Sequence, residues 1–332
     1  MSSWANRHIL QKRNLSQIPE SFRPTIIPRV ARSEVVLSES FQVDEVNEVI
    51  YPSGSSLFES KRQVDRYNYP VKKIETAKYN ATELTYQGKS YVFVILRNLR
   101  NTRDNDLWIT SYNKIRQFYT NKIVIIDDNS NVNTVNGKLV NTEVIISEWN
   151  GAGEILPYYY FLQHKWANTM IFLHDSMFLN RPFTSAELDG HVTFHWDFSN
   201  TEINGNIVTY VSLLQNNSAL LDYIKELKWR GCFGGASIID LDVVQHLEET
   251  YALFSKLTPA IRSRKERELF ERIFGIIMYY EKLVDDTTCS NFGDITQYPG
   301  AFESNYTSFE SAANTLTQSR YDTAIIKVWR GR

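Results

Sequence analysis

The chain has 332 residues, a formal net charge of −2, 42% hydrophobic residues and 22% charged residues. Its length predicts one large or two small domains with a sizeable core, and a charge so near neutral gives no overall field for nucleic acid or an anionic membrane. No apolar run is long enough to span a bilayer, and two cysteines, Cys232 and Cys289, cannot build a disulfide framework. We therefore expect a globular cytoplasmic protein with no nucleic-acid partner and no membrane span.

Residues 1–88 are polar and weakly patterned. At their start, a single acid, Glu20, stands against a set of basic residues: Arg7, Lys12, Arg13, Arg23, Arg29 and Arg32. Pro19, Pro24 and Pro28 break any helix in the same stretch. We predict an extended N-terminal arm, disordered or laid on a partner surface, with phosphate contact as a lesser alternative.

From Tyr91 onward, strand-like apolar runs alternate with stretches of helical periodicity. Length and β-branched content predict buried strands over residues 91–96, 122–127, 142–147 and 170–179. Helices are predicted to begin at Asp106 and within the sequence Asn150-Gly-Ala-Gly153, the second continuing through Trp166. This alternation predicts βαβ units and a parallel sheet.

The pattern beyond Pro182 is looser. We predict further strands over residues 191–197, 207–214, 237–240 and 324–329. A glycine-rich loop covers residues 229–236. Helices are predicted over residues 242–257 and from Ser263, where Ser263-Arg-Lys-Glu266 has the capping-box pattern.

Polar side chains mark the ends of the four strands predicted before Pro182. They are Arg97-Asn98, Asp127-Asp128, Ser147-Glu148 and His174-Asp175. In a parallel sheet these ends share one edge, which is where open α/β sheets place their ligands. We expect a cleft there with several carboxylates; the alternative is that polar residues simply begin the loops.

Asp175 interrupts the apolar stretch 170–179, and a charge inside such a run costs several kcal/mol unless it is paired, bound to a metal or at a strand end. A functional carboxylate at the strand end and a plain turn cap are both open readings. Similarly, Asn150-Gly-Ala-Gly153 either cradles a phosphate at a helix start or makes a tight turn into that helix. Fingerprints of dinucleotide-binding folds, P-loops, zincins and α/β-hydrolases are absent from the sequence.

Residues 91–183 resemble the nucleotide-sugar-binding half of GT-A fold glycosyltransferases. Four segments carry the resemblance: Val94-Ile-Leu-Arg-Asn98, Ile123-Val-Ile-Ile-Asp-Asp-Asn-Ser130, Asn150-Gly-Ala-Gly153 and Phe172-Leu-His-Asp-Ser176. It implies a GT-A-like (Rossmann-like) α/β fold with a mostly parallel central sheet flanked by helices, here with an extended N-terminal arm. It also implies that Asp127 contacts the base of a UDP- or GDP-sugar. The full implied donor-binding set is Leu96, Arg97, Asn98, Asp127, Asp128, Gly151, Gly153, His174 and Asp175.

The resemblance further implies a divalent cation at the fourth strand, where a D-x-D-type motif would hold Mn²⁺ or Mg²⁺ on the donor diphosphate. In this chain only Asp175 stands in that motif, flanked by His174 and Ser176. One carboxylate, substrate oxygens and water can suffice for such an ion. We predict a metal at Asp175, with a metal-free site neutralised by basic residues such as Arg97 as the alternative.

The second half would supply the acceptor side by the same resemblance. Trp229, Gly234 and Gly235 belong to a loop that would face a glycan or another hydroxyl acceptor. A catalytic base is expected at the start of the following helix, where the capping box uses Glu266 and leaves Glu268 and Glu271 freer. Our candidates for the base are Glu268, Asp197 and Glu266, with a solvated helix face as the alternative for Glu268.

These inferences divide the chain into an N-terminal extension (residues 1–88), a catalytic domain (89–285) and a tail packed on that domain (286–332). The catalytic domain would contain a donor half (89–183) and an acceptor half (184–285). We expect a glycosyltransferase that moves a sugar from a nucleoside-diphosphate donor to a hydroxyl. Two alternatives remain: a non-catalytic binding or structural protein of the same fold, and a sugar nucleotidyltransferase, which would need a glycine in the loop after the first strand.

Overall fold

The computed structural model describes residues 49–50, 73–75, 81–100, 102–131, 137–199, 205–299 and 309–328. All of them lie within one unit, Glu45–Arg332. Most of the predicted N-terminal arm, residues 1–88, lies outside the described residues, as does the end of the strand predicted over 324–329.

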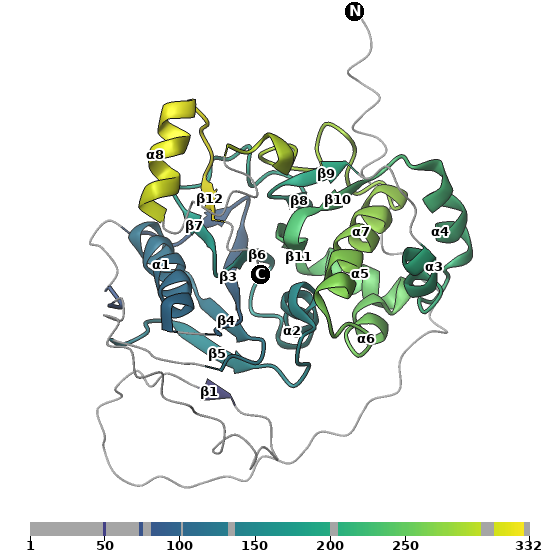
Figure 1. Cartoon of the computed structure of the whole chain (residues 1–332), viewed down its shortest axis with the longest axis horizontal. Helices are drawn as coiled ribbons and strands as arrows, with labels where there is room; N and C mark the ends of the chain where they lie inside the picture. The colour runs from purple at the N-terminus through teal and green to yellow at the C-terminus, as the bar shows by residue number, and fades with distance from the viewer. Residues whose placement is uncertain are drawn as a thin grey trace, which may run out of the picture. The chain divides into compact units, whose positions relative to one another are not determined.

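The central sheet has the strand order β1-β5-β4-β3-β6-β11-β8 (Figure 1). Its parallel part consists of β1 (Val49–Ile50), β5 (Thr142–Ile146), β4 (Ile123–Asp127), β3 (Lys89–Arg97) and β6 (Thr169–His174). A short strand, β2 (Thr85–Tyr86), pairs antiparallel with the start of β3. Because Arg97 is in register with Asp127, and Leu96 with His174, the polar ends of three strands meet at one edge.

The sheet changes direction after β6. β11 (Ser237–Asp240) runs antiparallel between β6 and β8 (Val192–Phe194). The predicted α/β fold, with a mostly parallel central sheet flanked by helices, is confirmed.

Helices cover the sheet because its central strands are apolar on both faces. Figure 1 shows α1 on one side and α2, α5 and α7 on the other. The α-helices are α1 (Thr102–Phe118), α2 (Leu156–His164), α3 (Gly205–Val211), α4 (Ser218–Tyr223), α5 (Leu241–Tyr251), α6 (Leu253–Leu257), α7 (Arg264–Tyr280) and α8 (Phe309–Ser319). Short 3₁₀ turns lie at η2 (Gly153–Ile155), η3 (Ile224–Glu226), η4 (Phe233–Gly235) and η5 (Ile295–Gln297).

Three predicted helices have different limits in the structure. The first begins at Thr102 rather than Asp106, four residues early. The one expected to continue through Trp166 is the turn η2 followed by α2, which ends at His164. The helix predicted over 242–257 breaks at Ala252, which adopts a left-handed conformation with φ 51°. The carboxylate of Glu248 accepts the N–H of Phe254 at 2.9 Å, which caps the new helix α6.

The strand predicted over residues 207–214 is wrong, because this stretch belongs to helix α3 and the turn after it. Ile207 and Val211 are fully buried while Val208 is exposed. Burial therefore follows a spacing of four residues, which is the helical repeat and not the alternation of a strand.

Two predicted strands are each divided. The stretch 170–179 forms β6 and β7 (Met177–Leu179), separated by a turn at Asp175 and Ser176. Likewise, 191–197 forms β8 and the beginning of β9 (Asp197–Ser199), which pairs with β10 (Arg230–Cys232). Asp175 thus stands at the end of a strand, where a carboxylate need not be buried inside the sheet.

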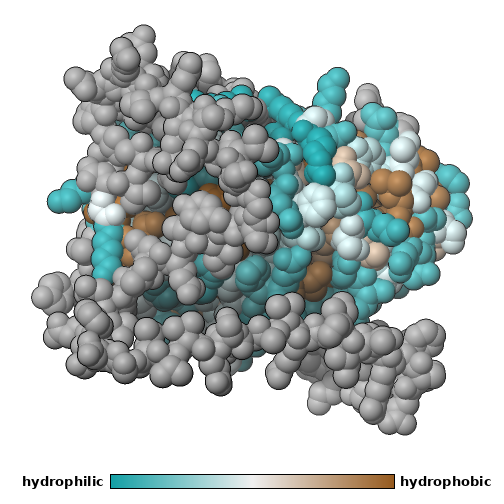
Figure 2. Space-filling model, turned by 90° about the horizontal axis from the view of Figure 1, so that it is seen from below, coloured by the Kyte–Doolittle hydropathy of each residue, from teal (hydrophilic) through white to brown (hydrophobic). Residues whose placement is uncertain are grey.

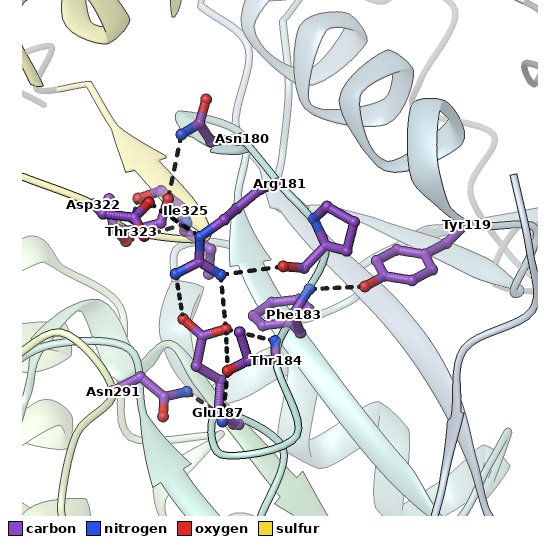
Figure 3. Close-up of polar contacts among 11 residues, drawn as sticks. Tyr119, Asn180, Arg181, Phe183, Thr184, Glu187, Asn291, Asp322, Thr323 and Ile325 are labelled. Carbon is purple, nitrogen blue, oxygen red and sulfur yellow. Dashed lines mark hydrogen bonds and ion pairs between the residues drawn. The ribbon is translucent and has the colours of Figure 1, made fainter. Parts of the chain in front are cut away.

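The C-terminal strand β12 (Ile325–Lys327) pairs antiparallel with β7. Figure 3 shows the polar network that holds its beginning: Arg181 lies between Glu187, at 2.9 Å, and Asp322, at 3.1 Å. Asn180 also donates to the carbonyl of Thr323 at 3.3 Å. These contacts fix β12 beside the turn that carries Asp175.

The described residues that Figure 2 shows in colour are mostly hydrophilic, with hydrophobic residues among them. Among the described residues, the large hydrophobic side chains that are exposed are Val208, Leu213 and Leu227. No helix in the described part of the chain combines the length and the hydropathy needed to cross a bilayer.

Candidate functional site

A cavity of about 630 Å³ lies at the carboxyl ends of the parallel strands. Every predicted donor-binding residue except Asp127 lines it. From the predicted acceptor and catalytic residues it contains Gly234 and Glu268, whereas Trp229, Gly235, Asp197 and Glu266 are outside its lining. The two halves of the fold therefore meet in this cavity.

Asp127 forms a buried ion pair with Arg97. The carboxylate accepts from Arg97 Nε at 2.7 Å, and the two side chains are 4% and 1% exposed. Asp127 also accepts the N–H of Ser130 at 2.8 Å, and the guanidinium lies over the Trp108 ring, 4.7 Å from its centroid. Asp127 thus neutralises a buried arginine, and the charge of Arg97 is balanced by that partner.

Asp128 organises the glycine turn that precedes α2. Its carboxylate accepts the N–H of Gly151 at 2.6 Å and that of Gly153 at 3.0 Å. Burial raises the pKa of Asp128, and these amides together with the charge of Arg267 act in the opposite direction. Because Asp128 accepts both glycine amides, these contacts favour the tight turn over the phosphate cradle.

The corner formed by His174, Asp175 and Ser176 joins β6 to β7. The Asp175 N–H donates to the Leu96 carbonyl at 2.9 Å, and the carboxylate lines the cavity. His174 Nε2 is 2.7 Å from the Gly234 carbonyl, which can only accept, so Nε2 carries the proton. Ser176 Oγ accepts from Lys327 Nζ at 2.7 Å.

This corner does not fit a divalent cation held by the protein alone. It offers one carboxylate, a histidine whose Nε2 is a donor, and a serine bonded to an ammonium group. In the described part of the chain, no three His, Cys, Asp or Glu side chains lie together as a metal site requires. Mn²⁺ or Mg²⁺ at Asp175 therefore stays a prediction.

Helix α7 brings charged side chains into the cavity: Arg264, Arg267, Glu268, Glu271 and Arg272. Glu268 is half exposed and paired with Arg264, with Nε and Oε1 3.0 Å apart. Arg267 Nε lies 2.9 Å from the Glu154 carboxylate, and Arg267 Nη1 lies 3.3 Å from the Gly151 carbonyl. Through Arg267, the helix is tied to the donor half.

Glu271 is partly buried and lines the cavity. Desolvation is the main cause that raises its pKa well above the ordinary carboxyl value, and the nearby charge of Glu154 adds to the effect. The Gly234 N–H acts in the opposite direction. Burial therefore favours the protonated form of Glu271, which can donate a hydrogen bond.

Two of the three predicted catalytic acids have structural partners. Asp197 is buried and hydrogen-bonded to Arg230 and Ser290, outside the cavity. Glu266 accepts the N–H of Arg262 at 2.7 Å, which caps the start of α7. Of the three, only Glu268 faces the cavity.

Aromatic lining comes from residues other than the predicted Trp229. Trp229 is 3% exposed and belongs to the core. Phe198 and Phe233 line the cavity instead, and the Arg272 guanidinium lies 5.0 Å from the centroid of the Phe198 ring. Gly234, with φ 63°, packs so closely that a Cβ there would be 2.8 Å from His174 Nε2.

The cavity thus combines positive charge for an anionic ligand with acids for proton transfer. Its cationic side chains are Arg97, Arg100, Arg264, Arg267, Arg272 and Lys327. Its acidic side chains are Asp128, Glu154, Asp175, Glu268 and Glu271. Lys327, Phe198 and Phe233 were missed by the sequence reasoning, because long-range strand pairing brings them here and no local motif marks them.

Comparison with known proteins gives limited information. No family model matches the chain, and no curated protein matches it. A solved structure of core-mannan synthase A from Aspergillus fumigatus, in its Mn/GDP form, is similar with a TM-score of 0.35 and 12% identity, covering 64% of this chain and 77% of that one. This likeness is too distant to assign a residue or an activity.

Proposed function

We propose that this chain is a glycosyltransferase that moves a sugar from a nucleoside-diphosphate donor to a hydroxyl of a glycan or protein. One observation supports it above all: a cavity at the carboxyl edge of a GT-A-like sheet holds cationic groups and a carboxylate base candidate, Glu268. The cations suit a diphosphate, and the carboxylate suits a hydroxyl that must lose a proton.

The donor would bind at the edge formed by β3, β4 and β6. Leu96 and Asn98 would contact the nucleoside, and Asp175 would accept hydrogen bonds from sugar hydroxyls. Arg100 and Arg272 line the same cavity and would attract the phosphates. Arg97 contributes less to this attraction because Asp127 balances its charge.

Transfer breaks the bond between the anomeric carbon of the sugar and the diphosphate oxygen, and forms a bond from that carbon to the acceptor oxygen. The acceptor proton passes to Glu268, which is present as a carboxylate in its ion pair with Arg264. The diphosphate leaves with the electron pair of the broken bond. Glu271, whose protonated form is favoured by burial, would form a hydrogen bond that orients a sugar hydroxyl.

A screen of UDP- and GDP-sugars that measures release of the nucleoside diphosphate distinguishes the roles of Glu268 and Glu271. Glu268→Gln removes the base, so kcat should fall about 10²- to 10⁴-fold while KM changes little. Glu271→Gln keeps a hydrogen-bond donor and should retain KM, whereas Glu271→Ala should raise it. Glu249→Gln, at an exposed position on α5, is the matched control.

Asp175→Ala tests the placement of the donor. Full activity of Asp175→Ala with a donor that the wild type turns over would refute this placement. Binding of a nucleotide sugar without any turnover would favour the non-catalytic alternative. Release of pyrophosphate from a nucleoside triphosphate would instead favour a sugar nucleotidyltransferase.

A further inference from the structure

Lys327 is a buried cation at the corner where the expected metal motif is incomplete. It is 9% exposed, lines the cavity and donates from Nζ to Ser176 Oγ at 2.7 Å. The two residues are 151 positions apart in the chain, so this contact depends on the fold.

The backbone of Lys327 is held on both sides. The Tyr298 hydroxyl accepts its N–H at 2.9 Å and donates to its carbonyl at 3.1 Å. Lys327, on β12, is in register with Met177 on β7. The N–H of the next residue, Val328, donates to the Ser176 carbonyl at 2.9 Å. Lys327 therefore extends from a rigid backbone, which is what a preorganised binding group requires.

A lysine at this depth is expensive for folding alone, because desolvating an ammonium group costs several kcal/mol and an apolar side chain of similar length would pack without that cost. Nearby negative charge offsets this cost: Asp175 precedes Ser176 in the same turn, and the charge of Lys327 acts to lower the pKa of Glu154. The position of Lys327 in the lining of the cavity adds a further candidate partner, an anionic ligand.

We infer, on the basis of the proposed function, that Lys327 holds the donor diphosphate at the His174–Asp175–Ser176 corner, so that donor binding requires no divalent cation. The ammonium group makes a charge-assisted hydrogen bond to a phosphate oxygen. It lies beside Ser176, in the turn that carries Asp175, where the sequence predicted a metal, and the strand pairing of β12 with β7 puts it there.

Titration calorimetry of the full chain with uridine, UMP and UDP, and with guanosine, GMP and GDP, tests this inference. Each series is measured in EDTA and again with Mn²⁺. The wild type should bind the diphosphate equally well under both conditions. Lys327→Met should weaken diphosphate binding about ten- to a hundredfold while leaving nucleoside affinity unchanged.

Lys256→Met is the matched control, since Lys256 is exposed on α6 and absent from the cavity lining. The unchanged nucleoside affinity of Lys327→Met also shows that the variant is folded. If Lys327→Met weakens nucleoside and diphosphate alike, the lysine has a structural role and the inference fails. It also fails if the wild type needs Mn²⁺ for UDP or GDP, whereas binding of neither diphosphate under any condition refutes the proposed function itself.

Discussion

The buried pair Arg97–Asp127 leads to a prediction that separates structure from ligand binding. Asp127→Asn keeps an oxygen for the Ser130 N–H but removes the charge that balances Arg97 at 2.7 Å. Both side chains are almost fully buried, so the variant removes the carboxylate charge that faces the Arg97 guanidinium beside the core. We expect a loss of about 3–5 kcal/mol in the free energy of unfolding, the range measured when one partner of a buried pair is removed.

Urea denaturation followed by tryptophan fluorescence measures this loss, and a double-mutant cycle assigns it. Arg97→Met should destabilise as well, whereas Arg97→Met combined with Asp127→Asn should recover much of the loss because no lone charge remains. Nucleoside affinity should remain that of the wild type in Asp127→Asn. A variant with unchanged urea midpoint and lost nucleoside binding would refute this reasoning and place Asp127 on the base, as the sequence resemblance implied.

Three further predictions concern other parts of the fold. Gly153→Ala would put a Cβ 2.0 Å from an arginine side chain of α7 and should lower the free energy of unfolding, measured by urea denaturation, by about 1–3 kcal/mol. Gly88→Ala is the control for backbone strain alone, because its Cβ would meet nothing within 4 Å at a similar positive φ. The pKa of Glu271 is raised on folding, so its contribution to stability is complete below its ordinary value of 4.5 and is lost as pH rises through the folded pKa. In thermal melts, the melting temperature of Glu271→Gln should therefore rise relative to that of the wild type at alkaline pH. The hydrogen bond to Glu281 raises the pKa of His246, so the stability that this half-exposed pair contributes is lost as pH rises through the folded pKa of His246. The loss in the free energy of unfolding caused by His246→Gln, under about 1 kcal/mol, should be measurable at pH 6 and vanish at pH 9.

The sheet was predictable because its strands are continuous apolar runs and because parallel strands must end at one edge. The register of Arg97 with Asp127 follows from that pattern. The role of each candidate acid was not predictable, since it depends on partners from distant segments. Asp197 illustrates this: it ends an alternating stretch as a catalytic acid would, yet Arg230 and Ser290 bind it.

Lys327 shows the same limit from the opposite direction. Its strand was predicted from the apolar run that contains it, but its pairing with β7 was not, because pairing between strands so far apart leaves no local sequence signal. The predicted strand over residues 170–179 also concealed the turn at Asp175. Only when the stretch divides into β6 and β7 does a partner for β12 become available.

The contacts of each acid show whether it holds the cavity together or can act on a ligand. Asp127 and Asp128 stand at the sheet edge but are bound to Arg97 and to glycine amides, so their charges maintain the shape of that edge. Glu268 comes from α7, a helix that Arg267 ties to Glu154 and to the Gly151 carbonyl in the donor half. A base carried by a separate element can act only if that element is fixed relative to the donor, because small displacements cost large factors in rate. The two contacts of Arg267 provide that connection, which explains why the glycine turn must leave space for its side chain.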